Sequence, residues 1–109
     1  MTFNVRSVGN ATVISVDGQL IVGNRQELKQ KVLAELERGA RRFVIDFTRT
    51  GYIDSSGLGI LVSLSRSIRQ ERGDLRLASL NDDLRTLFEL TKLDTLFEIH
   101  ASVRDALAE

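Results

Sequence analysis

The feature that most constrains the fold is a short, almost wholly apolar run lying between two amphipathic segments. Phe43–Phe47 contains one charged residue, Asp46, and is typical of a strand covered on both faces. Apolar residues recur at helical spacing before this run, from about 24 to 38, and after it, from about 56 to 70. A covered strand between two helices requires crossover connections. The sequence therefore predicts an α/β fold on a small mixed, mostly parallel β-sheet.

Further runs extend this order toward both ends of the chain. Phe3–Val8 and Thr12–Asp17 are β-rich, and Gly9-Asn10 between them favours a tight hairpin turn. Residues 48–55 are expected to form a loop. The remaining predicted elements are a strand at 75–80, a third helix capped by Asn81-Asp82-Asp83, a brief strand at 96–99 and a terminal helix at about 102–108. We expect one domain over residues 1–109, with an N-terminal hairpin and about four packed helices.

The first helix carries a signal at each end. Asn24 can cap free N–H groups, and Glu27, three residues later, can reach back in a capping box. Gly39 is well suited to end this helix. Its core-facing positions are predicted to be Leu28, Val32, Leu33 and Leu36.

Charge and residue types exclude several classes of function. Lys plus Arg and Asp plus Glu each number 15, so no basic excess favours nucleic acid or an anionic membrane surface. There is no Cys and His100 is the only histidine, so we expect no metal and no cofactor. No apolar run approaches the roughly 20 residues of a membrane span, and residues 1–6 lack a signal-peptide pattern. We therefore expect a cytoplasmic protein without membrane insertion.

The segment Gly51–Gly59, which runs from the buried strand into the second helix, is the best candidate for a site. Ligands and partners usually meet open α/β sheets at this carboxyl edge. Ser55 and Ser56 lie where the helix exposes N–H groups and the positive end of its dipole, which favours negative charge. Gly57 and Gly59 each cost about 1 kcal/mol relative to Ala in a helix. Close approach by another chain or tight packing on the sheet would offset that cost.

Other interpretations of this segment stay open. Asp54 or Ser55 can simply cap the helix, and Asp46 can bond the loop backbone. A nucleotide- or phosphate-binding loop is less favoured, because neither Gly-x-x-x-x-Gly-Lys followed by Ser or Thr nor Gly-x-Gly-x-x-Gly is present. A hydrolase ranks last, because the segment is not Gly-x-Ser-x-Gly and the only base, His100, fits a strand end or cap. We expect no enzyme.

The run Val44–Gly59, ending in Asp54-Ser55-Ser56-Gly57-Leu58-Gly59, resembles the bacterial anti-sigma factor antagonists, the single-domain STAS family. The resemblance covers essentially the whole chain and includes Gly18-Gln19-Leu20 and Leu90–Phe97. It implies a STAS-like fold, in agreement with the order of elements above. It also implies that Ser56 is phosphorylated by the anti-sigma factor, itself a serine-protein kinase.

The resemblance thus implies a regulatory binding protein. The unphosphorylated chain would bind a kinase-type anti-sigma factor and release a sigma factor, phosphorylation of Ser56 would end binding, and a serine phosphatase would reset the switch. Leu58 is expected to point into the core, whereas Ile60 lies at the edge of the apolar stripe and is expected to be exposed. The expected partner-binding residues are Asp54, Ser55, Ser56, Gly57, Gly59 and Ile60.

One departure from the family pattern lies at Ile21, where many members carry an acidic residue. The loop that Ile21 opens lies beside the phosphorylation segment in the family fold, so the choice of partner can differ. The alternative function is a phosphorylation-independent STAS adaptor that docks to a transporter or a larger signalling assembly.

Overall fold

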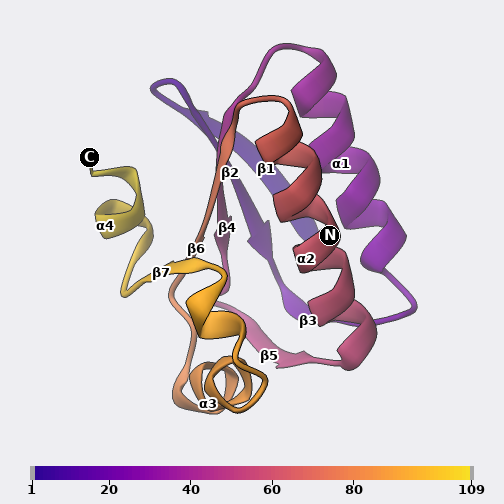
Figure 1. Ribbon diagram of the computed structural model, residues 1–109, viewed down its shortest axis with the longest axis vertical. Helices are drawn as coiled ribbons and strands as arrows, with labels where there is room; N and C mark the ends of the chain where they lie inside the picture. Colours follow the sequence, from indigo (N-terminus) through magenta and orange to yellow (C-terminus); the bar gives the residue numbers. More distant parts are fainter. Residues whose placement is uncertain (1, 109) are drawn as a thin grey trace.

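The computed structural model describes residues 2–108, in which a five-stranded sheet carries helices on both faces (Figure 1). The strand order is β1-β2-β4-β6-β7, and only the β1–β2 pair is antiparallel. The sheet confirms the predicted α/β class. Its strands are β1 (Phe3–Val8), β2 (Ala11–Val16), β4 (Arg42–Asp46), β6 (Asp74–Ala78) and β7 (Glu98–His100).

The N-terminal hairpin has the predicted two-residue turn. Val8 lies opposite Ala11, which leaves Gly9 and Asn10 to make the connection. Gly9 has a φ of +62°, a left-handed conformation that glycine adopts without a steric penalty.

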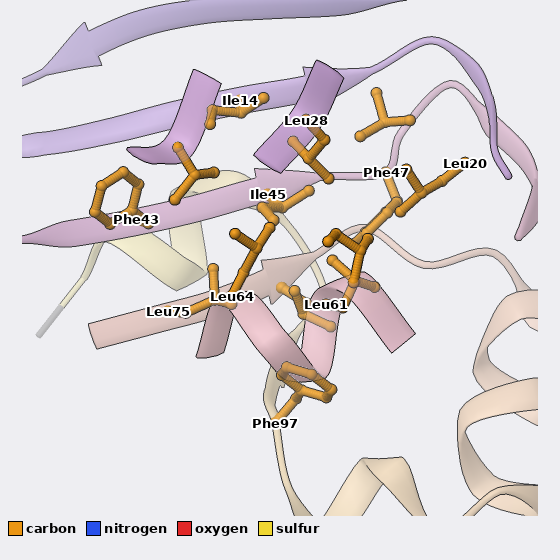
Figure 2. Close-up of a cluster of buried hydrophobic side chains, with 14 of the residues drawn as sticks. Ile14, Leu20, Leu28, Phe43, Ile45, Phe47, Leu61, Leu64, Leu75 and Phe97 are labelled. Carbon is orange, nitrogen blue, oxygen red and sulfur yellow. The ribbon is translucent and has the colours of Figure 1, made fainter. Parts of the chain in front are cut away.

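Two helices cover one face of the sheet, and a short helix covers part of the other. α1 (Arg25–Glu37) and α2 (Ser55–Gln70) lie side by side on the first face, and α4 (Val103–Leu107) lies across from them (Figure 1). Within β4, Phe43 and Ile45 enter the main core, whereas Val44 joins a smaller cluster on the α4 side. β4 is therefore covered on both faces, as its composition predicts. Figure 2 shows side chains from strands and helices meeting in the main core.

The C-terminal third closes one end of the main core. α3 (Asp82–Leu90) begins at Asn81, whose side chain accepts from the Leu84 N–H at 2.8 Å, as predicted for a cap. A short 3-10 turn, η1 (Leu93–Thr95), follows and leads into β7. Phe88 of α3 then packs edge-to-face against Phe97, with ring centroids 6.0 Å apart.

Two short strands lie where the sequence predicts no strand. β3 (Gly18–Leu20) and β5 (Thr50–Ile53) pair in parallel as a separate two-stranded sheet, so the predicted loop over 48–55 is wrong over residues 50–53. The Thr50 hydroxyl anchors this ribbon by donating to the Val16 carbonyl at 2.6 Å. Strands of three and four residues show too little alternation to be read from local sequence.

Leu33 is wrongly placed in the core by the sequence. It is 39% exposed, whereas Leu28, Val32 and Leu36 are buried. These three residues repeat every four positions and form one narrow stripe, which leaves Leu33 about 100° away around the helix. Among residues 2–108, no helix is long and apolar enough to cross a membrane.

Candidate partner-binding site

The side chain of Asp54 joins the two segments of the candidate site, the start of α2 and the loop after β3. The backbone of Asp54 is extended at the N-cap of α2, and Oδ1 accepts from the Gly57 N–H at 2.7 Å. Oδ2 accepts from the Val22 N–H at 3.0 Å, which ties the start of α2 to a loop 32 residues away in sequence. The predicted cap is confirmed, and the same carboxylate also makes a long-range contact.

The pKa of Asp54 lies below its ordinary value of 3.8. The hydrogen bond from the Gly57 N–H is the main cause, since it favours the charged carboxylate. Partial desolvation opposes this effect, while the N–H groups of Val22 and Ser56 and the guanidinium of Arg25 add to it. The carboxylate is thus held in its charged form at the N-terminus of α2, where the helix dipole also favours it.

The side chain of Asn24 stabilises the loop 21–24 by two hydrogen bonds to the backbone. Its Oδ1 accepts from the Ile21 N–H at 2.9 Å, and its Nδ2 donates to the Gln19 carbonyl at 2.9 Å. The predicted capping box is therefore wrong, because the amide of Asn24 is used by the loop before α1 and makes no cap bond to the helix. The loop presents Val22, which is 62% exposed, next to Asp54.

The two candidate hydroxyls lie in the first turn of α2. The helix begins at Ser55, one residue earlier than predicted. Ser55 is exposed and Ser56 is half-buried. Both residues follow a carboxylate that already accepts hydrogen bonds at this helix end, so a further negative group there would share the same N–H donors.

The two glycines of this turn have different surroundings. A Cβ on Gly57 would collide with the Leu20 carbonyl oxygen and lie 2.9 Å from Cγ2 of Ile53. Gly57 is buried, so its missing side chain is required by packing within the chain. A Cβ on Gly59 would meet nothing within 4 Å, and Gly59 is exposed. Of the two glycines, only Gly59 is therefore solvent-exposed with space for a partner group beside it.

Ile60 is not part of the exposed surface. It is 6% exposed and belongs to the main core, which contradicts its expected exposure and its place among the partner-binding residues. α1 packs beside α2, so the buried flank of α2 is wider than contact with the sheet alone would require. Leu58 is buried as predicted.

Two other predicted roles are also borne out. Asp46 Oδ1 accepts from the Thr48 backbone N–H at 3.1 Å and from its hydroxyl at 2.6 Å, so Asp46 bonds the loop after β4. His100 ends β7, with Nε2 3.2 Å from a carboxylate oxygen of Glu98. Within residues 2–108, no cluster of three His, Asp or Glu side chains is placed to hold a metal ion.

Sequence reasoning missed two exposed apolar side chains at this site. Tyr52 on β5 is 57% exposed, and Val22 lies on the loop bonded to Asp54. The available signal was an apolar residue in a segment too short to bury it. Together with Ser55, Ser56 and Gly59, they give the candidate site a surface with both apolar and polar groups.

Comparisons with known proteins place this site in a family. The family model described as STAS domain matches residues 2–106. BtrV of Bordetella bronchiseptica, named as an anti-sigma factor antagonist, is 31% identical over 105 residues, covering 89% of this chain and 90% of its own. The anti-sigma-B factor antagonist of Bacillus subtilis is 29% identical over 98 residues, covering 90% of this chain and 89% of its own. An anti-sigma factor antagonist structure from Thermotoga maritima superposes with a TM-score of 0.90 at 25% identity, covering 96% and 91% of the two chains. The chain belongs to the STAS domain family and resembles its anti-sigma factor antagonists.

Proposed function

We propose that this chain is an anti-sigma factor antagonist that is switched by phosphorylation of Ser56. In its unphosphorylated form it binds a kinase-type anti-sigma factor and so frees a sigma factor. The names of the relatives support the class of partner. The observation that carries the switch is the Asp54 carboxylate. It accepts hydrogen bonds from the backbone N–H groups of Gly57 and Val22 and so holds in place the first turn of α2, in which Ser56 lies.

The proposed switch acts by electrostatics at the interface. A phosphate on Ser56 adds about −1.5 to −2 charges at pH 7. The N-terminus of α2 tolerates this charge, because the helix dipole favours anions and the phosphate can share the N–H donors that Asp54 bonds. A partner carboxylate about 5 Å away would be repelled by about 3 kcal/mol per unit charge at an effective dielectric of 20. Since 1.4 kcal/mol changes affinity tenfold, one such contact is enough to separate the complex.

The chemistry of this switch comes from the partners. The anti-sigma factor transfers the phosphate and a serine phosphatase removes it, while this chain acts by binding alone, in the cytoplasm, without a cofactor. Ser55 provides a matched control for Ser56, because the two hydroxyls are adjacent in the first turn of α2.

Incubation with the host's anti-sigma kinase and ATP tests the proposal. We expect one phosphate per chain by intact mass, mapped to Ser56 by fragmentation. Ser55→Ala is expected to accept the phosphate and Ser56→Ala to accept none. Equal phosphorylation of both variants, or none of the native chain, would contradict the assignment.

The second candidate, a phosphorylation-independent adaptor for a transporter or larger signalling assembly, is favoured by Ile21. Ile21 opens the loop whose next residue bonds to Asp54, and it puts a half-buried apolar side chain where many family members carry an acid. An adaptor would bind its target with the same affinity whether Ser56 is native, Ala or Asp. That result would replace the switch with the adaptor.

A further inference from the structure

A groove borders α2 at the end far from Ser56. It has a volume of about 340 Å³, and Leu96, which follows η1, lines it opposite α2. Val62 is half-buried and Leu96 is 38% exposed, so the two supply an apolar floor. The α2 side chains that line the groove are Val62, Ser65, Arg66, Arg69 and Gln70.

The rim of this groove carries two cations, Arg66 and Arg69. Arg66 and Arg69 are exposed, and neither forms an ion pair with any carboxylate of residues 2–108. Among the arginines of residues 2–108, only Arg38, Arg41 and Arg76 form ion pairs, so it is the position of Arg66 and Arg69 beside the groove that distinguishes them. The residues that line the groove include these two arginines and no carboxylate, so the groove carries positive charge next to exposed apolar surface. Guanidinium groups recognise carboxylates in a bidentate way, which makes an acidic group the complementary ligand.

The groove lies on the face of α2 that also carries Ser55 and Gly59, and Ser56 lies about 100° around the helix from Ser55. Ser55, Gly59, Val62, Arg66 and Arg69 follow one another by three or four residues, so they lie on one face of the helix. Ten residues separate Ser56 from Arg66, which is about 15 Å along the axis. A standard interface buries about 800 Å² per partner, a disc of about 16 Å radius. A partner centred on the exposed face of α2 between Ser55 and Gly59 would therefore reach the groove.

We propose that this groove is a second contact for the anti-sigma factor, which would place there an acidic segment carrying at least one apolar side chain. The carboxylates of that segment pair with Arg66 and Arg69, and the apolar side chain lies on Val62 and Leu96. The identity of the partner rests on the proposed function, but the contact does not depend on phosphorylation of Ser56.

Charge reversal on two faces of the molecule tests this contact. The groove variant is Arg66→Glu with Arg69→Glu. The matched control is Arg6→Glu with Arg104→Glu, two exposed arginines on β1 and on α4, which covers the opposite face of the sheet from α2. The dissociation constant for the purified host anti-sigma factor is measured by titration calorimetry at low and high salt. Melting curves verify that both variants fold.

The groove variant is expected to bind the anti-sigma factor at least about tenfold more weakly than the native chain at low salt. Its dissociation constant is also expected to lose most of its dependence on salt. The control is expected to bind within about twofold of the native chain. Equal affinities of the groove variant and the control would overturn the contact. If charge reversal disturbs folding, Arg66→Gln with Arg69→Gln replaces it. Its affinity for the anti-sigma factor is expected to lie between those of the native chain and the groove variant.

Ser56→Asp, measured in the same series, separates this contact from the switch. Weak binding by the groove variant with unchanged binding by Ser56→Asp would support the contact and contradict the switch. The opposite pattern would support the switch and overturn the contact. Self-association that the groove variant abolishes, with no effect on anti-sigma factor binding, would also overturn the contact.

Discussion

A single carboxylate, that of Asp54, joins the two segments from which the candidate site is built. Its two oxygens accept from N–H groups of the α2 first turn and of the loop after β3, so neither segment can shift without loss of a hydrogen bond. Capping by Asp54 was predictable from the sequence, because an acid before a helix is a local signal. The bond to Val22 was not predictable, since it links residues 32 positions apart.

Asp54→Asn tests this double role through its dependence on pH. The amide keeps one acceptor oxygen and loses the other, so we expect the melting temperature at neutral pH to fall by about 3 to 6 °C. The folded-state pKa of Asp54 is lowered, so the contribution of the carboxylate is fully present above the ordinary value of 3.8. It is lost as the pH falls from there through the folded-state pKa.

The difference in melting temperature between the native chain and Asp54→Asn is thus expected to be constant from pH 7 to about 5 and to shrink toward pH 2.5. Thermal melts by circular dichroism measure it. A difference that keeps its full size at the lowest pH would show that the charge of Asp54 does not matter.

Alanine at the two glycines of α2 gives opposite expected results. Gly57→Ala forces a Cβ onto the Leu20 carbonyl, and overpacking of this kind costs about 1–3 kcal/mol of unfolding free energy. Gly59→Ala meets open space and gains helix propensity, so it is expected to stabilise the fold by up to about 1 kcal/mol. Urea denaturation of both variants measures the two values. Equal destabilisation would contradict the packing described for Gly57.

At the scale of elements, local pattern predicted the helices well and their neighbours poorly. The α2 stripe with Leu58 followed from periodicity, but the burial of Ile60 in the main core is set by tertiary packing, which the local pattern does not contain. The same limit applies to β3 and β5, whose pairing is a property of the folded chain. Asn24 illustrates a competition, because its side chain satisfies the loop instead of the helix that it precedes.

Ile60→Ala tests whether this residue belongs to the core or to a partner surface. Loss of a buried isoleucine side chain is expected to lower the unfolding free energy by about 2–4 kcal/mol. Leu33→Ala, a truncation at an exposed apolar position of α1, is expected to cost less than about 1 kcal/mol. Chemical denaturation measures both losses of unfolding free energy. A loss for Ile60→Ala as small as that for Leu33→Ala would contradict the burial of Ile60 in the core.

At the scale of the whole molecule, the site lies at one end of a fold whose stability comes from elsewhere. Leu20 on β3 and Ile53 on β5 are part of the main core between the sheet and the α1–α2 layer. They anchor the two segments that the Asp54 carboxylate joins. The order of strands and helices was predictable because each long element carries its own period. A negative charge added at Ser56 therefore acts on a preformed surface, and its main effect is expected in the partner complex and not in the fold.

The most direct test of the switch compares two forms of this chain, one unmodified and one carrying phosphate on Ser56 alone. Titration calorimetry gives the affinity of each for the host's anti-sigma factor, and melting curves verify that both are folded. We expect the phosphorylated form to bind at least about 100-fold more weakly with a nearly unchanged melting temperature. Equal affinities of the two folded forms would contradict the phosphorylation switch.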